Sequence, residues 1–279
     1  MTNGLLRKRM GRLGWCCSVL LLGSVATGLL LCSGCGRDEK KGQADSASRA
    51  KLLLYCGAGI RTAVAEIVEQ FEKTHSVTIE ADYSGSNILL SRIKLTKRGD
   101  LYMPGDVRYV HQADGEGLIA SSRDACYFIP VILVRKGNPK NIRGVADLAR
   151  EGLRVGFGDA RACAIGRVTN EILGQNGLDP DDLEGNVVFR SLTVNELGVH
   201  IKVGKIDATI VWDAIAAQYP KEGEIVPIPK DRNVISTVPV AVLRSSKHPK
   251  EAAAFQEFVL SEEGRAIFVK HHYTTEAPR

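Results

Sequence analysis

The chain has 279 residues, of which 44% are hydrophobic and 25% charged. This composition is close to the globular average, so a largely disordered chain is excluded. The formal net charge of +5 comes mostly from the first 34 residues, which hold four cations and no acid and leave 33 basic against 32 acidic residues after them. The positive excess therefore belongs to the N-terminus, and no electrostatic argument supports binding to nucleic acid.

The N-terminus has the layout of an export signal. Four cations precede an uncharged run over residues 15–31, and the small residues Ser33 and Gly34 stand just before Cys35. This order is typical of a secretory signal peptide, here over residues 1–34. The small residues before the cysteine resemble a bacterial lipobox, which implies cleavage after Gly34 and lipidation of Cys35. Two alternatives stay open: a retained membrane anchor, because the run approaches the spanning minimum, and a redox CxxC motif ending at Cys35.

Residues 35–50 lack large apolar side chains and are predicted to form a flexible tether. A lipid and a tether would hold the folded part at a membrane surface, in the periplasm or on the cell surface. The folded part keeps three cysteines, Cys56, Cys126 and Cys163. An odd number cannot pair completely, so at least one is predicted to be a free, buried thiol.

Strands and helices alternate along the rest of the chain. Short apolar runs predict strands at residues 51–56, 77–83, 100–103, 127–134, 154–157, 187–190, 208–212 and 236–243. Apolar residues at helical spacing predict helices at residues 60–73, from 88, at 106–117, 165–173, 194–203 and 249–260, and from 261. This order predicts an α/β fold with mainly parallel sheets and helices on both faces.

Two of these strands, residues 127–134 and 236–243, are continuous apolar runs that resemble each other. The chain between them carries its own alternation of strands and helices, which predicts a second lobe inserted into the first. We therefore expect both runs to cross between two lobes. Lobe I would comprise residues 51–129 and 241–279, and lobe II residues 130–240.

Three loops that join a strand to a helix, at residues 57–62, 84–88 and 158–166, are rich in Gly, Ser and Ala. Small residues leave the unpaired N–H groups of a helix's first turn open to a ligand, at the positive end of the helix dipole. Such loops suit an anion held by neutral donors, and ligands of open α/β sheets lie beyond the carboxyl ends of the strands. Each loop taken alone could simply cap its helix, but three of them in two lobes favour a ligand site.

Several segments resemble the substrate-binding proteins of ABC importers, of the type II kind, along the whole chain after the tether. The matching segments are residues 55–64, 99–106, 116–119 and 255–264. The resemblance implies a two-lobed binding protein, not an enzyme, with no cofactor, which captures a solute for a membrane permease. We expect it to act as a monomer.

Within that class the chain resembles the molybdate- and tungstate-binding proteins. The turn at residues 83–89 matches their Ser-rich second loop, and residues 158–166 resemble their GDP…PAG loop without its prolines. The family's first serine falls at Gly59, and its aromatic residue falls at Trp212. The resemblance implies a molybdate or tungstate site built from Ala58, Gly59, Ser84, Gly85, Ser86, Ala164, Ile165 and Trp212.

Other interpretations stay open. The ligand could be another anion, such as phosphate, sulfate or an organic acid, and the protein could signal rather than transport. Residues 57–62 with Glu80 mimic the dinucleotide fingerprint of an exported enzyme, although a threonine replaces its third glycine. Arg61, Arg161 and Arg167 could add charge-assisted bonds to a ligand, but solvated helix faces are the simpler interpretation. No catalytic ordering of Ser, His and Asp and no metal-ligand spacing stands out.

Overall fold

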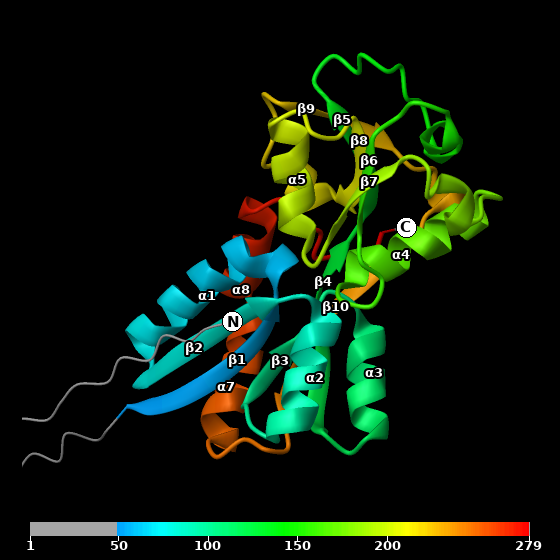
Figure 1. The fold of residues 1–279 in the computed structure, drawn as a ribbon. Helices are drawn as coiled ribbons and strands as arrows, with labels where there is room; N and C mark the ends of the chain where they lie inside the picture. The colour runs from blue at the N-terminus through cyan, green and yellow to red at the C-terminus, as the bar shows by residue number, and fades with distance from the viewer. Residues whose placement is uncertain (1–48, 279) are drawn as a thin grey trace, which may run out of the picture. The chain divides into compact units, whose positions relative to one another are not determined.

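A computed structural model of the chain describes residues 49–278; the predicted signal peptide, Cys35 and the tether up to residue 48 lie outside the described residues. Two five-stranded sheets form the centres of two lobes, as the alternation of elements predicted (Figure 1). Every buried apolar residue of the described chain lies between Leu52 and Tyr273. Residues 47–279 form one compact unit, so we expect this unit to fold without the segment before it.

Lobe I is built on a sheet with the strand order β2-β1-β3-β10-β4. Its strands are β1 (Ala50–Gly57), β2 (Val77–Ser84), β3 (Leu101–Met103), β4 (Ile119–Phe128) and β10 (Ser236–Leu243). β1 runs parallel to β2 and β3, with Leu54 opposite both Ala81 and Leu101, whereas β10 runs antiparallel to β3 and β4. The helices are η1 (Ala58–Ile60), α1 (Arg61–Thr74), α2 (Ser86–Thr96), α3 (Val107–Gly115), α7 (Pro249–Leu260) and α8 (Glu262–Lys270).

Lobe II is built on a sheet with the strand order β7-β6-β8-β5-β9. Its strands are β5 (Pro130–Arg135), β6 (Val155–Gly158), β7 (Val187–Ser191), β8 (Ala208–Trp212) and β9 (Gly223–Pro227). β6 runs parallel to β7 and β8, and β5 runs antiparallel to β8 and β9. Its helices are η2 (Val145–Ala149), α4 (Ala164–Gln175), η3 (Pro180–Leu183), α5 (Val194–Lys202), α6 (Asp213–Ala216) and η4 (Lys230–Arg232).

Of the two predicted crossovers, the first passes from lobe I to lobe II and the second does not. The first apolar run is divided at Ile129: β4 ends at Phe128 in lobe I, and β5 starts at Pro130 in lobe II. The second run lies wholly in lobe I, where β10 pairs with β3 and β4. Residues 236–240 therefore belong to lobe I rather than lobe II, and the return connection precedes Ser236. A central strand buried on both faces is as apolar as a crossing strand, so apolarity alone did not separate the two cases.

The structure also contains strands that short apolar runs did not predict. β4 begins at Ile119, and its residues from Ala120 to Asp124 are exposed, because this strand lies at the edge of its sheet. β9 lies at the edge of the other sheet and was missed for the same reason. Ala50, predicted as the last residue of the tether, opens β1.

Two further features of this unit concern its cysteines and the length and polarity of its helices. Cys56, Cys126 and Cys163 are free and buried, so the predicted free thiol is confirmed. Between residues 49 and 278, the helices are all too short or too polar to cross a membrane.

Candidate functional site

Four helices begin at the ends of strands that face the boundary between the lobes. η1 follows β1 and leads directly into α1, α2 follows β2, and α4 and α5 follow β6 and β7. The residues before η1, α2, α4 and α5 are Gly57, Gly85, Cys163 and Thr193, and none of their side chains accepts a capping hydrogen bond. By contrast, the Asp106 side chain caps α3. The first-turn N–H groups of the four helices therefore have neither an intrahelical acceptor nor a side-chain cap.

These helix starts converge on one small cavity between the lobes. Its volume is about 20 Å³, and its lining residues are Gly57, Ala58, Gly59, Ser84, Gly85, Ser86, Gly105, Phe128, Cys163, Ala164, Ile165, Thr193, Val194 and Trp212. All eight residues predicted from the sequence as a site are in this lining. None of the lining side chains carries a formal charge at neutral pH. A space of this size is somewhat more than one water molecule needs, so it suits a small group rather than a large one.

Ser86 is fixed as a donor toward this cavity. Its side chain is buried, and its hydroxyl oxygen accepts a hydrogen bond from the Gly105 N–H at 3.0 Å. Its carbonyl oxygen accepts a hydrogen bond from the Tyr102 hydroxyl at 2.8 Å. A hydroxyl that already accepts one bond keeps its proton free to donate. The Ser86 proton is therefore available to an acceptor in the cavity.

Gly59 and Trp212 lie against each other in the cavity wall. A Cβ added at Gly59 would lie 3.0 Å from the Val194 side chain and 3.1 to 3.2 Å from the Trp212 indole, so the indole fills the room that a side chain at Gly59 would need. The Trp212 ring stacks on Phe128 with ring centroids 4.5 Å apart. The Gly59 carbonyl accepts a hydrogen bond from the Tyr273 hydroxyl at 2.6 Å. The loop and the indole are thus held rigidly against each other.

The three arginines considered from the sequence do not line the cavity. Arg161 has 91% of its side chain exposed and pairs with Asp159 at 3.1 Å, while Arg61 lies over the Tyr83 ring at 4.9 Å. Arg167 pairs with a glutamate one turn further along α4. Arg61 and Arg167 lie on exposed helix faces, as the simpler interpretation predicted, whereas Arg161 lies in the exposed turn before α4.

Burial keeps the Cys163 thiol uncharged. Its thiol lies in the cavity wall, and burial raises its pKa to about 11. The thiol is therefore protonated at neutral pH and adds no negative charge next to a bound anion.

Metal and catalytic alternatives gain no support from the described residues. Between residues 49 and 278 no cluster of three or more His, Cys, Asp or Glu side chains could hold a metal ion. Asp213, the first residue of α6, accepts hydrogen bonds from the N–H groups of Ala214, at 2.9 Å, and Ile129, at 3.4 Å, so its carboxylate makes contacts within the fold.

Some residues of the cavity wall were not predicted from the sequence. Thr193 and Val194 line the cavity because α5 begins there, and Gly105 and Phe128 follow or end strands of lobe I. The helix beginning at residue 194 was predicted, but its start was not connected with the other three. The polar turn before it, Ser191-Leu192-Thr193, was the available signal.

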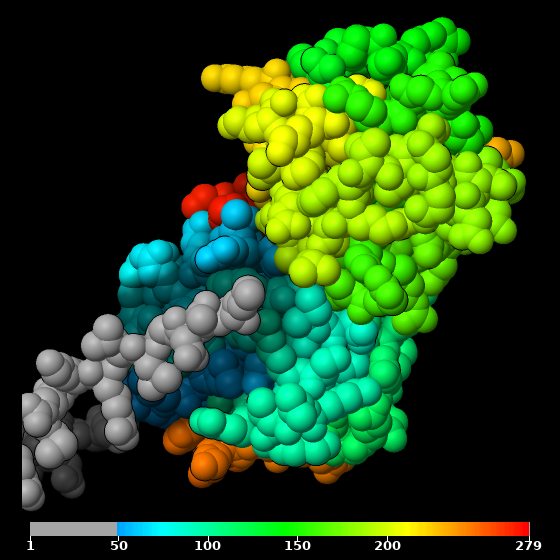
Figure 2. All heavy atoms as spheres, viewed as in Figure 1, coloured from blue at the N-terminus to red at the C-terminus, as the bar shows by residue number. Residues whose placement is uncertain are grey.

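The lobes touch along the edges of the cavity. The Asn87 N–H donates to the Ala162 carbonyl at 3.1 Å, and the Asn87 side-chain amide donates to the Arg161 carbonyl at 2.7 Å. A Cβ added at Gly85 would lie 2.4 Å from the Ala162 oxygen, so only glycine allows this approach. Figure 2 shows the yellow-green atoms of lobe II against the cyan atoms of lobe I on one face. The structure thus represents lobes closed over the cavity.

Known proteins resemble this chain over most of its length. The model of the family described as bacterial extracellular solute-binding protein matches residues 52–274. A Haemophilus influenzae protein, named as a binding protein with no ligand in its name, is 30% identical over 223 residues, which are 80% of this chain and 90% of that protein. A Bacillus subtilis protein named as an ABC transporter substrate-binding lipoprotein is 24% identical over 254 residues, 90% of this chain and 95% of the other. The molybdate-binding protein ModA of Mycobacterium tuberculosis is 26% identical over 218 residues, 77% of this chain and 81% of ModA.

Solved structures share the fold. The sulfate-binding protein SubI of Mycobacterium tuberculosis superposes with a TM-score of 0.72 at 18% identity, over 82% of this chain and 88% of SubI. The periplasmic molybdate-binding protein of Azotobacter vinelandii superposes with a TM-score of 0.66 at 16% identity, over 82% of this chain and 100% of the other. At these identities the likeness concerns the fold alone, and it confirms the two-lobed α/β architecture expected from the sequence.

Proposed function

The chain belongs to the family of bacterial extracellular solute-binding proteins, and we propose that its solute is a small tetrahedral oxyanion. Molybdate or tungstate is the preferred ligand in this proposal. The observation that carries this proposal is the convergence of four uncapped helix starts on a cavity without charged side chains. Binding rather than catalysis is the activity of this family.

Neutral donors can hold an anion in such a cavity. The first-turn N–H groups of α2, α4 and α5 carry the positive ends of three helix dipoles, and the short turn η1 adds its own N–H groups at the same point. The proposed donors are the backbone N–H groups of η1, at Ala58 and Gly59, and of α4, at Ala164 and Ile165, together with hydroxyls and the Trp212 indole N–H. The hydroxyls are those of Ser84 and Ser86, beside Gly85.

The chemistry of the wall separates the candidate anions. Phosphate keeps a proton near neutral pH and needs a strong acceptor for it, whereas no carboxylate lines this cavity. Molybdate, tungstate and sulfate are unprotonated dianions under the same conditions and need donors only. Among them a rigid cage selects by size, because Ser86, Gly59 and Trp212 are each held in place by neighbours.

The protein would act as the capture component of an ABC importer. The signal-like N-terminus and Cys35 support a lipid anchor, as does the similarity to a substrate-binding lipoprotein of Bacillus subtilis. We propose that the protein is held by this lipid at the outer face of the membrane, works as a monomer and delivers its anion to a membrane permease.

Calorimetry on residues 47–279 with molybdate, tungstate, sulfate and phosphate tests the ligand. We expect tight binding of molybdate or tungstate, and Ser86→Ala should weaken it about 10- to 150-fold, since a hydrogen bond to a charged group contributes about 1.5–3 kcal/mol. Arg161→Ala, on the exposed face of the same loop as Cys163, is the matched control and should bind as the wild type does. No heat with either metal oxyanion, or tighter binding of an organic acid with a large loss in Arg161→Ala, would contradict the proposal.

A further inference from the structure

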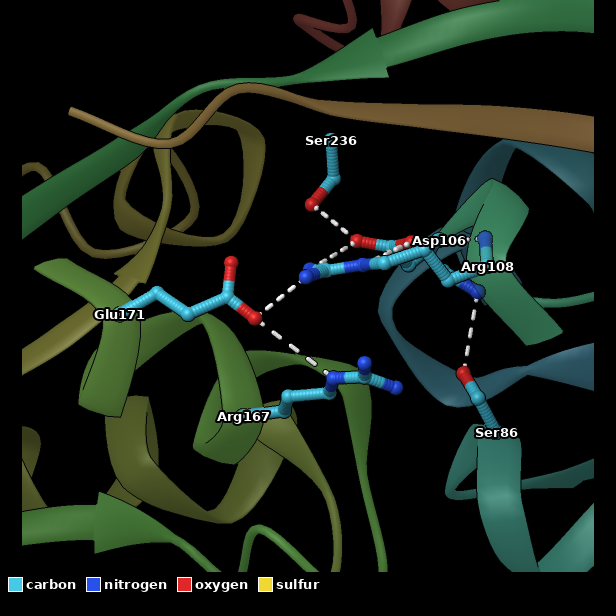
Figure 3. A network of polar contacts seen from close by, with 7 residues as sticks. Ser86, Asp106, Arg108, Arg167, Glu171 and Ser236 are labelled. Atoms are coloured by element: carbon cyan, nitrogen blue, oxygen red, sulfur yellow. Dashed lines mark hydrogen bonds and ion pairs between the residues drawn. The ribbon is translucent and has the colours of Figure 1, made fainter.

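A network of polar side chains beside the cavity joins lobe I to lobe II (Figure 3). Asp106 lies at its centre and is buried at the start of α3. Its carboxylate accepts hydrogen bonds from the Arg108 N–H at 2.9 Å, from the Arg108 guanidinium at 2.8 and 3.0 Å, and from the Ser236 hydroxyl at 2.9 Å. Ser236 is the first residue of β10, directly after the return connection from lobe II. Asp106 thus fixes the Arg108 side chain to the hinge side of lobe I.

The free end of the Arg108 guanidinium reaches the other lobe. Its Nη1 donates to the Glu171 carboxylate on α4. The Arg167 Nε lies 3.5 Å from the same glutamate oxygen, so Glu171 is also held from within its own lobe. Of the ion pairs between residues 49 and 278, Arg108–Glu171 is the one that joins lobe I to lobe II.

The same network reaches the proposed ligand donors on both sides. Gly105, the residue before Asp106, donates its N–H to the Ser86 hydroxyl in lobe I. In lobe II, Glu171 lies on α4, whose first residues Ala164 and Ile165 line the cavity. The Arg108–Glu171 ion pair joins α3 to α4, and it therefore brings the proposed donors of lobe I and lobe II together.

We infer that Arg108 and Glu171 form a latch that holds the lobes closed on the ligand, with Asp106 as the positioning residue for Arg108. The inference rests on the proposed function for the nature of the ligand. Both partners are partly exposed, with 30% and 37% of their side chains accessible, so salt can screen the pair. The latch forms after the lobes meet. It therefore acts on the rate of ligand release rather than on the rate of capture.

Stopped-flow fluorescence with molybdate measures these two rates. Trp212 lines the cavity and is the sole tryptophan of residues 47–279, so its emission reports the site itself. Glu171→Gln should raise the release rate about three- to tenfold and change the capture rate less than twofold. Raising NaCl from about 50 to about 500 mM should speed release from the wild type more than from the variant. The matched control is Glu184→Gln, because Glu184 pairs with Arg190 inside lobe II and should leave both rates unchanged.

Distances between the lobes give a second measurement that needs no ligand. Nitroxides on Thr96→Cys in lobe I and Gln175→Cys in lobe II occupy exposed helix ends, and the native cysteines are buried. Glu171→Gln should shift the distance distribution toward longer separations. Equal release rates together with equal distance distributions for the variant and the wild type would overturn the latch. If the wild type binds none of the four oxyanions, the proposed function fails, and the distance distributions alone decide the latch.

Discussion

Gly85→Ala should block closure of the lobes while leaving each lobe intact. Gly85 has φ −66° and ψ 143°, which any residue can adopt, so alanine introduces no backbone strain. Its Cβ would lie 2.4 Å from the Ala162 oxygen and 2.7 Å from the Leu192 oxygen, both in lobe II. Ordinary contact begins at 3.4 Å, so the lobes must separate by about 1 Å at this point.

That displacement breaks the contacts that close the cavity. The hydrogen bond from the Asn87 N–H to the Ala162 oxygen would lengthen from 3.1 Å to about 4 Å, and the bond from the Asn87 side chain to the Arg161 carbonyl would be lost with it. Each bond contributes about 0.5–1.5 kcal/mol, so affinity should fall about 5- to 150-fold. The melting temperature of the ligand-free protein should hardly change, because the clash exists only between closed lobes.

Calorimetry with molybdate and thermal unfolding without ligand measure the two effects on residues 47–279. Gly115→Ala is the matched control, because a Cβ at that position meets nothing within 4 Å. Wild-type affinity in Gly85→Ala would refute the closed arrangement as the binding state. A large loss of melting temperature in the ligand-free variant would show instead that the glycine serves the fold of lobe I.

Two further predictions concern pH and anchoring. Burial raises the pKa of Asp213 from 3.8 to about 6, so the folded state holds this proton more tightly than the unfolded state. The resulting contribution of Asp213 to the free energy of unfolding, at most about 3 kcal/mol, is present below about pH 4 and is lost as the pH rises to about 6. The unfolding free energy of the wild type minus that of Asp213→Asn should therefore fall across this window. A difference that does not change with pH would refute the raised pKa of Asp213. Cys35→Ala in the full chain should release the protein from membranes or block its processing, and a variant that sediments with membranes and migrates like the wild type would exclude lipidation.

The sequence was most informative where local chemistry decides the structure. Apolar runs and helical spacing predicted both lobes, and the small residues of three loops predicted the cavity wall around Gly59 and Ser86. These features depend on neighbours in the chain, because a loop between a strand and a helix must lie at the carboxyl end of that strand.

The features that were missed depend on contacts between distant residues. Nothing local indicates that Arg108 meets Glu171, or that the Trp212 indole occupies the room beside Gly59. The position of β10 was also set by its partners: its apolarity suits a crossing strand and a central strand equally. Such arrangements follow from the packing of whole lobes, which a periodic pattern does not specify.

A crystal structure of residues 47–279 grown with tungstate, with anomalous data collected at a tungsten absorption edge, tests the central claim most directly. We predict one strong anomalous peak in the cavity, with the anion's oxygens within hydrogen-bond distance of the Ala58, Gly59 and Ala164 N–H groups and the Ser86 hydroxyl. Tungsten bound only at basic side chains of the surface, with none in the cavity, would contradict an oxyanion site built from neutral donors.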